Sequence, residues 1–361
     1  MPPFQLLCHL LDTWLAGRPV GDDLVAAVAA PDVPWPRLVT LSGVHLLTPA
    51  LAEALAAPHL AARLPEELRS YLRAIREAAA ERNQRLHDQL EQVALRLNDV
   101  EIVPLALKGA IRLVDGLWPD PALRFMHDLD LLVPQPTLRR SVERLLRDGW
   151  RQIDGDESEA DHHVVLVHPE AEARVELHVE PVVHGLKALL PAARTLARAR
   201  PAAVGSAMIA VPLIEDQLVH LVAHGMLQHD FVGSGRFLLR DLVEQALLAR
   251  SMTAGELHAA RDRFVEPGLA YAWDVSVALA GRCLPHSWAH PGHDGLVARC
   301  LVRRMLLQQR SPALMQFLGP AGWTVGRLLG HVTGGTAAGA ESLSWRQLIE
   351  RLALFRRKTR W

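Results

Sequence analysis

The chain has 361 residues, half of them apolar, so a sizeable core can form without disulfides or structural metals. Lys and Arg number 39 against 40 Asp and Glu, which disfavours a long DNA or RNA partner, because polymer phosphates need a positive surface. The cysteines Cys8, Cys283 and Cys300 lie far apart and form no C-x-x-C pair, which favours a reducing compartment and argues against a zinc knuckle.

The first residues do not resemble an export signal. No basic region precedes the first apolar run, and Asp12 interrupts that run too early for a secretory signal. Charged residues break the later apolar stretches well before the roughly 20 residues that cross a bilayer. We therefore expect a soluble cytoplasmic protein with no membrane partner.

Residues 1–98 show helical periodicity and are expected to form an N-terminal helical unit. The clearest helix begins after Pro65 and places apolar residues on one stripe, with charges on the opposite side. The stripe consists of Leu68, Leu72, Ile75, Leu86, Leu90, Val93 and Leu97. Such a helix should pack against an apolar surface.

Strand-like segments concentrate in residues 99–200, which we expect to be an α/β core. A short buried strand with Pro104 near its start is followed by a short helix from Ala110 to about Leu117. Further strands are predicted over 123–133, 163–168 and 173–180, with a helix over about 136–148 before the last two.

Residues 201–361 return to helical periodicity and are expected to form a C-terminal helical unit. A glycine-rich run, G-G-T-A-A-G-A, interrupts this unit at 334–340, and the chain ends in the basic R-R-K-T-R-W. The predicted fold class is α+β, with a mixed sheet core flanked by the N-terminal and C-terminal helical units.

The string H-D-L-D-L-L-V carries the strongest chemical signal. Asp128 and Asp130 stand at i and i+2 on a predicted strand, so their side chains leave the same face, while Leu129, Leu131 and Val133 point to the other. Neighbouring carboxylates repel unless they share cations, and oxygen-rich sites of this kind suit Mg²⁺ carrying nucleotide phosphates. An exposed acidic strand face is the simpler alternative for D-x-D alone.

A second polar strand face follows in A-R-V-E-L-H-V-E. Strict alternation sets Arg174, Glu176, His178 and Glu180 opposite the apolar residues of this run. Glu176 could supply a third carboxylate, and metals bridged by such acids would align an attacking oxygen with a leaving pyrophosphate. A half-exposed antiparallel strand is the alternative interpretation.

Lys108 and Gly109 directly follow a predicted strand and open a helix in L-A-L-K-G-A. Backbone N–H groups at this helix start, together with the charge of Lys108, could face a phosphate. A glycine turn is commonly only a turn, and its interest here comes from preceding the aspartates by about twenty residues.

Taken together, L-K-G-A-(x)-R-L, L-R-F-M-H-D-L-D-L-L-V and V-E-L-H resemble an uncharacterised bacterial nucleotidyltransferase-like family within the DNA polymerase beta superfamily. Members typically show L-K-G, then R-x-x-x-D-(I/L)-D-(L/I)-L-V, then a strand ending in L-H. The resemblance extends from about Trp35 to Arg250 and includes R-N at Arg82 and Asn83.

The resemblance implies a nucleotidyltransferase-fold mixed sheet flanked by helices. It also implies that Asp128, Asp130 and Glu176 are the metal ligands and the catalytic acids. The superfamily more commonly carries Asp as its third acid, and Glu is one methylene longer.

The same resemblance implies a nucleotide-binding role for Lys108, Gly109, Arg124 and His178. Lys108 and Gly109 would take the place of the superfamily's Gly-Ser phosphate loop, which usually lies closer to the acidic pair. Arg124 would contact phosphate or brace the aspartate strand.

The implied activity is transfer of a nucleoside monophosphate from an NTP, with ATP as the first expectation, using Mg²⁺ or Mn²⁺. The acceptor would be a small molecule, a peptide or a protein. The alternative is a non-catalytic regulatory or accessory protein, antitoxin-like or a biosynthetic partner, that keeps the fold and binds another protein.

Two polar pairs of the C-terminal unit have structural interpretations. His220 and His224 share a helix face at i and i+4 in H-L-V-A-H, but no H-E-x-x-H order supports a zinc hydrolase, so a structural or substrate-lining role is expected. The family also tends to carry a histidine at the position of His224. Arg240 and Asp241 are expected to form a structural ion pair, and a contact with the nucleotide is the alternative.

Overall fold

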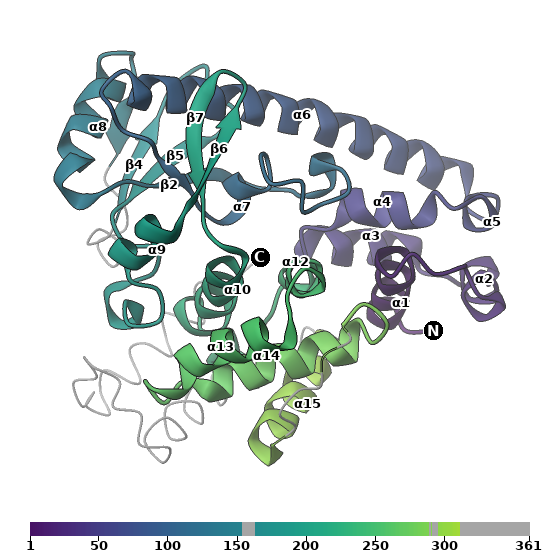
Figure 1. Cartoon of the computed structure of the whole chain (residues 1–361). Helices are drawn as coiled ribbons and strands as arrows, with labels where there is room; N and C mark the ends of the chain where they lie inside the picture. Colours follow the sequence, from purple (N-terminus) through teal and green to yellow (C-terminus); the bar gives the residue numbers. More distant parts are fainter. Residues whose placement is uncertain (154–162, 289, 291–294, 311–361) are drawn as a thin grey trace, which may run out of the picture.

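The structure is a computed structural model that describes residues 1–153, 163–288, 290 and 295–310. The glycine-rich run at 334–340 and the basic chain end lie outside these residues. The described part forms a seven-stranded mixed sheet and a large set of helices (Figure 1), which confirms the predicted α+β class. No helix in it is long and apolar enough to cross a membrane.

Residues 1–98 are helical, as predicted, and end in one long helix. The elements are α1 (Pro3–Leu15), α2 (Asp22–Ala29), α3 (Trp35–Val44), α4 (Thr48–Leu55), α5 (Pro58–Ala61) and α6 (Glu66–Asn98). α6 begins directly after Pro65, and Glu66 and Glu67 in its first turn favour the positive end of the helix dipole. The predicted stripe is buried except for Ile75, which is half-buried.

The sheet has the strand order β3-β4-β5-β2-β1-β7-β6. Its strands are β1 (Leu105–Ala106), β2 (Asp128–Leu132), β3 (Arg151–Ile153), β4 (His163–Val167), β5 (Arg174–His178), β6 (Arg200–Val204) and β7 (Ala207–Val211). β2 runs parallel to β5 and antiparallel to β1, while β1 runs parallel to β7. The strand predicted over 123–133 starts at Asp128, because a 3₁₀ turn, η1 (Pro121–Leu123), precedes it.

The hairpin β6–β7 extends the sheet beyond the expected end of the core at residue 200. The sequence did not predict these strands, because Arg200–Val204 and Ala207–Val211 are rich in alanine, a poor strand former. Gly205 makes the tight turn between them with a φ of +54°, a conformation that glycine adopts without a steric cost.

α6 covers one face of the sheet (Figure 1), where its apolar stripe meets the apolar side chains of β2 and β5. This core contains Leu86, Leu90, Val93, Leu97, Leu129, Leu131, Val133, Val175 and Leu177, all buried. Burying each such side chain contributes about 1.5–3 kcal/mol, which fixes the strand register and with it the direction of the polar residues between them. The polar residues of β2 and β5 therefore point to the face opposite α6.

Helices also follow and interrupt the strands. They are α7 (Lys108–Ile111), η2 (Gln135–Thr137), α8 (Leu138–Leu146), η3 (His184–Leu186), α9 (Ala192–Arg198), α10 (Ile214–Val222), the π-helical η4 (Ala223–Gln228), α11 (Phe231–Ser234), α12 (Leu239–Arg250), α13 (Ala254–Val265), α14 (Ala270–Cys283) and α15 (Leu296–Arg310). α8 confirms the predicted helix over about 136–148. The helix predicted from Ala110 to about Leu117 was wrong in length, since α7 is a single turn and Gly116 then adopts a positive φ of 65°.

The two helical units pack on each other in one helical body, which we define as α1–α5 with α10–α15 (Figure 1). Asp12 of α1 accepts hydrogen bonds from the backbone N–H groups of His286 and Ser287, which follow α14. His45 accepts one from the backbone N–H of Leu239 at the start of α12. The helices before and after the sheet segment in the chain therefore share a core.

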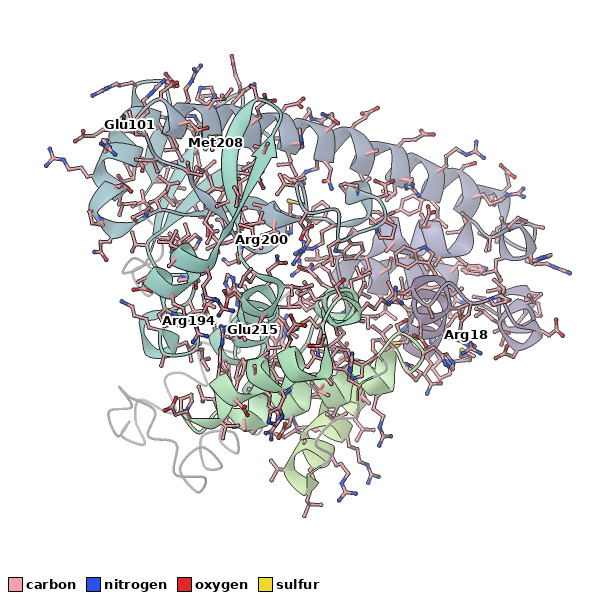
Figure 2. All side chains as sticks on the ribbon, in the orientation of Figure 1. Arg18, Glu101, Arg194, Arg200, Met208 and Glu215 are labelled. Carbon is pink, nitrogen blue, oxygen red and sulfur yellow. The ribbon has the colours of Figure 1, made fainter. Side chains whose placement is uncertain are left out.

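Ion pairs tie the sheet to this body. Glu215, at the start of α10, pairs with Arg198 of α9 and Arg263 of α13. Figure 2 shows Glu215 between the sheet and the helices, with Arg200 of β6 above it.

Candidate active site

The register of β2 and β5 brings the predicted acids together. The strands run parallel with Asp130 opposite Glu176, Asp128 opposite Arg174 and Leu132 opposite His178. Side chains alternate along a strand, so the polar members of both strands leave the same face, opposite α6. The sequence had assigned Asp128, Asp130 and Glu176 to one site, and the structure places all three on this face.

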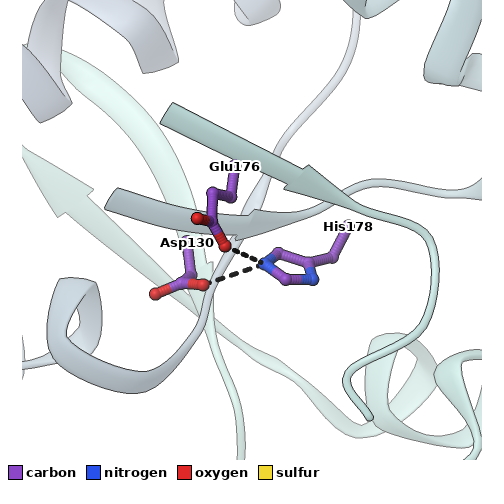
Figure 3. Close-up of side chains that lie close together, drawn as sticks. All are labelled: Asp130, Glu176 and His178. Atoms are coloured by element: carbon purple, nitrogen blue, oxygen red, sulfur yellow. Dashed lines mark hydrogen bonds and ion pairs between the residues drawn. The ribbon is translucent and has the colours of Figure 1, made fainter. Parts of the chain in front are cut away.

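Asp130, Glu176 and His178 form the tightest part of the group (Figure 3). Nε2 of His178 lies 2.8 Å from Oδ1 of Asp130 and 3.5 Å from Oε2 of Glu176. These residues are buried, and each offers a ligand atom that lies within 4.8 Å of the others. Such a set of carboxylate oxygens and an imidazole nitrogen is suited to a divalent cation.

One oxygen of Asp130 supports this cation assignment directly. Oδ2 has no hydrogen-bond partner among the residues that the structure describes. Water cannot replace such a partner easily, because the side chain is only 1% exposed. A buried carboxylate oxygen without a partner is costly, and a coordinated cation would satisfy it. The residues present therefore fit a bound divalent cation.

Lys108, which follows β1, contacts the same aspartate from the side of β2 opposite β5. Its Nζ lies 2.7 Å from Oδ1 of Asp130, and the backbone N–H of Leu107 donates to the backbone oxygen of Asp130. Lys108 adopts a left-handed φ of 48°, a strained conformation that costs of order 1–3 kcal/mol for a residue with a side chain. Because α7 is a single turn, an anion contact here would depend on the charge of Lys108 more than on a helix N-terminus.

Neighbouring charges set the ionisation of these acids. Burial raises the pKa of Asp130, but the charge of Lys108 and the hydrogen bond from His178 outweigh it and hold that pKa well below its usual value. Burial also opposes ionisation of Glu176, yet its pKa is lowered, mainly by the hydrogen bond from His178. Burial and the charges of Asp130 and Glu176 raise the pKa of Asp128. Added positive charge would oppose these effects and favour the ionised form of Asp128.

Arg174 is a residue of this face to which the sequence gave no role. Its Nη2 lies 2.9 Å from Oε1 of Glu176 and 3.4 Å from Oδ2 of Asp128, and half of its side chain is exposed. The alternation along β5 had placed it on the polar face. That alternation was the available signal, but it could not reveal the contact with Asp128, which depends on the register with β2.

Arg124 and Gly109 contribute to the packing around the segment before β2. Nε of Arg124 lies 2.6 Å from Oε2 of Glu244 on α12, and the side chain is 4% exposed, which favours the bracing role over the phosphate contact. A Cβ on Gly109 would come within 3.0 Å of Cβ of Met126, so a side chain there would press on the segment before β2. Both residues hold the chain that leads to Asp128.

Arg82 and Asn83, the R-N of the resemblance, hold the same segment from α6. Arg82 donates to the backbone oxygen of Met126, 2.7 Å away, and Asn83 donates to the backbone oxygens of Pro121 and Arg124. These bonds add side-chain donors from α6 to backbone carbonyl groups of this segment. They fix the position at which β2 begins.

The histidines of α10 and η4 lie on the helical side of the site. Burial lowers the pKa of His220 to about 3, and the charge of Lys108 adds to this effect. His224 stands in the π-helical segment, and its ring centroid lies 5.9 Å from that of His220 and 4.2 Å from that of His229. π-Helical turns occur frequently at functional sites. The expected substrate-lining role of His224 remains a prediction.

The expected structural pair Arg240–Asp241 is confirmed, with 2.7 Å between Nη2 and Oδ1. Both residues precede Glu244 on α12, close to the pair that Glu244 forms with Arg124. Acids and guanidinium groups thus alternate at the junction of β2 with the helical body.

Comparison with models of known protein families matches residues 31–285 to the family described as "Uncharacterised nucleotidyltransferase". No curated protein and no solved structure matches the chain. The matched range contains every residue of the site described above.

Proposed function

We propose, on the premise that the chain belongs to this family of uncharacterised nucleotidyltransferases, that it transfers a nucleoside monophosphate from an NTP to an acceptor. ATP is the first candidate donor, and the acceptor is a hydroxyl, phosphate or amine of a small molecule, peptide or protein. The observation that carries the proposal is the placement of Asp130 beside Glu176 on parallel strands, with Lys108 against Asp130. We expect the activity in the cytoplasm.

Asp128, Asp130 and Glu176 would hold Mg²⁺ or Mn²⁺. The imidazole of His178 lies close to ligand atoms of Asp130 and Glu176, which makes Mn²⁺ the first cation to test. A bound cation would neutralise the charge that develops on the transferred phosphoryl group. His178 orients Asp130 through their hydrogen bond, and Lys108 brings a positive charge to the face where phosphates would lie.

In the transfer step, the acceptor oxygen or nitrogen forms a bond to the α-phosphorus while the bond to the departing pyrophosphate breaks. Glu176 is the residue we assign to take the acceptor's proton, because its position opposite Asp130 places a carboxylate at the reacting face. The remaining contribution of the chain is alignment and electrostatic stabilisation.

The proposal is tested with Asp128→Asn, since Asp128 is partly exposed and its replacement leaves the Lys108–Asp130 pair intact. We expect turnover of labelled NTP with Mn²⁺ to fall by at least about 100-fold. Asp88→Asn, on the exposed side of α6, is the matched control and should keep full turnover. The assay uses cell extract as the acceptor source and mass spectrometry to find what gains a nucleotide. Equal turnover by both variants would remove Asp128 from the mechanism.

One observation favours the non-catalytic alternative. Lys108 and Arg174 already pair with the acids, so the group could be a structural ion-pair network in a regulatory or accessory protein. The two functions differ in ligand binding, because a ligand that binds the native state raises the melting temperature. A melting temperature that NTP and Mn²⁺ together leave unchanged would favour the alternative.

A further inference from the structure

Arg174 lies where a cation is expected under the proposed function. Its guanidinium contacts Glu176 at 2.9 Å and Asp128 at 3.4 Å, and so bridges an acid of β5 and an acid of β2. A divalent cation held by Asp128, Asp130 and Glu176 under the proposed function would draw on the carboxylates of Asp128 and Glu176 that Arg174 now contacts. The guanidinium and the cation therefore compete for these two carboxylates.

Lys108 is the other cation at these acids, and its surroundings make it the less mobile of the two. The Lys108 ammonium pairs with a carboxylate that is only 1% exposed, and the backbone at residues 107 and 130 is hydrogen-bonded. The Arg174 side chain is 50% exposed, and the residue begins β5. Exposed ion pairs are weak, whereas breaking a buried pair leaves an uncompensated charge. An arriving cation would thus displace Arg174 and leave Lys108 in place.

A displaced Arg174 side chain remains beside the bound cation, because its backbone is fixed in the ladder opposite Asp128. The cation of a nucleotidyltransferase arrives with the phosphates of an NTP, and those oxygens would then be the nearest unpaired anions. A guanidinium matches phosphate oxygens with two parallel N–H donors, which a lysine cannot do. Arg174 therefore has a partner in each state of the site. It contacts the acids before the cation binds, and it lies near the phosphate oxygens afterwards.

We propose that Arg174 is a triphosphate-binding residue whose guanidinium holds Asp128 and Glu176 in the free protein and moves to the triphosphate when cation and nucleotide bind. This inference rests on the proposed function. It makes two opposite predictions for one substitution: without Arg174, the cation alone should bind more tightly, and the triphosphate should bind more weakly.

The test uses the full chain with two probes that do not depend on the acceptor or on the base. Mn²⁺ alone is titrated and followed by electron paramagnetic resonance, and inorganic tripolyphosphate is then titrated in the presence of saturating Mn²⁺ by calorimetry. The variants are Arg174→Ala and Arg174→Lys, and Arg139→Ala is the control, because it removes an exposed guanidinium that pairs with Glu143 on α8. Circular dichroism confirms that each variant is folded.

For Arg174→Ala we expect the Kd for Mn²⁺ to fall about three- to tenfold, since a competing positive charge is gone. The Kd for tripolyphosphate should rise about tenfold or more, because a charge-assisted bidentate contact is lost. Arg174→Lys should recover part of the charge effect but not the bidentate contact, so its tripolyphosphate affinity stays low. Arg139→Ala should match the wild type in both titrations.

The failures of this inference and of the proposed function differ. If the wild type binds Mn²⁺ and Arg174→Ala binds it equally well or more weakly, the competition is refuted. If tripolyphosphate affinity is unchanged in Arg174→Ala, the phosphate contact is refuted. If the wild type itself binds no Mn²⁺, the cation site of the proposed function is wrong, and the inference falls with it.

Discussion

Asp128 and Asp130 have different surroundings although a single residue separates them. Asp130 is enclosed, with Lys108 and His178 both on Oδ1, whereas the Asp128 side chain is 28% exposed and meets the guanidinium of Arg174. Lys108 and His178 therefore stabilise the charge of Asp130 in the free protein, whereas the charge of Asp128 depends more on the cation or ligand that binds. Alternation along the strand predicted that both carboxylates share a face. It could not predict how deeply each one is buried, because burial depends on neighbours that are distant in sequence.

His45 gives a pH dependence that is independent of the site. Its ring packs against Phe4 and Phe237, Nδ1 accepts from the backbone N–H of Leu239, and burial lowers its pKa to about 4. The unfolded chain takes up this proton near pH 6.5 and the folded protein only near pH 4, so stability falls as pH decreases through that window. Between pH 7.5 and pH 5, His45 accounts for a loss of about 2 kcal/mol in the free energy of unfolding.

Urea unfolding at pH 7.5 and pH 5 checks this prediction. Glutamine keeps an acceptor but does not titrate, so His45→Gln should lose about 2 kcal/mol less than the wild type on acidification. Equal losses in both proteins would show that His45 is not held neutral by its surroundings.

At the scale of elements, Glu244 of α12 joins the helical body to the residue that directly follows α7 and to the segment between η1 and β2. Its Oε1 lies 2.9 Å from Nε of Arg112, and its Oε2 lies 2.6 Å from Nε of Arg124, with all of these side chains at most 4% exposed. Burial raises the pKa of Glu244, but the guanidinium charges outweigh this effect and lower it to about 2. The acid is thus ionised at neutral pH, and its stabilising share is lost only as pH falls below about 4.5.

Glu244→Gln should destabilise the protein by about 3–5 kcal/mol at pH 7, because the buried Arg124 loses its carboxylate partner and Arg112 keeps only Asp115, while the side-chain volume is kept. The measurement is the free energy of unfolding in urea. Arg139→Ala, which breaks the exposed pair with Glu143, is the control and should change stability little. A Glu244→Gln protein as stable as this control would contradict the bracing role.

The elements differ in how far the sequence determined them. β2, β5 and α6 were predicted because their apolar residues repeat with a clear period, and burial on one face enforces that period. The contacts of Arg124 and Arg174 were not predicted, because each depends on a partner from another element. Periodicity reports which face a residue occupies, whereas partners follow from register and from the packing of α12 against the core.

On the scale of the molecule, the helical body joins residues near the start of the chain to residues that follow α14. Asp12 is 2% exposed, and its carboxylate accepts the backbone N–H groups of Ser287 at 2.9 Å and of His286 at 3.1 Å. α6 packs against this body with its first turns and against the sheet with its later ones. We therefore expect the sheet and the helical body to unfold together.

Asp12→Ala tests this coupling. It removes the acceptor of two backbone donors, and we expect a loss of about 1–3 kcal/mol in the free energy of unfolding, with one transition retained. Tryptophan fluorescence and far-ultraviolet circular dichroism in urea should give the same midpoint, and Asp12→Asn should retain part of the stability. Midpoints that separate would mean that the two parts unfold independently.

The distance along the chain between Glu244 and its arginines has a consequence for synthesis. Arg112 precedes Glu244 by 132 residues and Arg124 precedes it by 120, so the ribosome releases both guanidinium groups long before their acid. At about 5–20 residues per second, this delay lasts roughly 6–26 s. The nascent β2 region cannot settle into its final burial during that time, and chains stalled before residue 244 should be cut by protease at the segment around Arg124 that the completed protein protects.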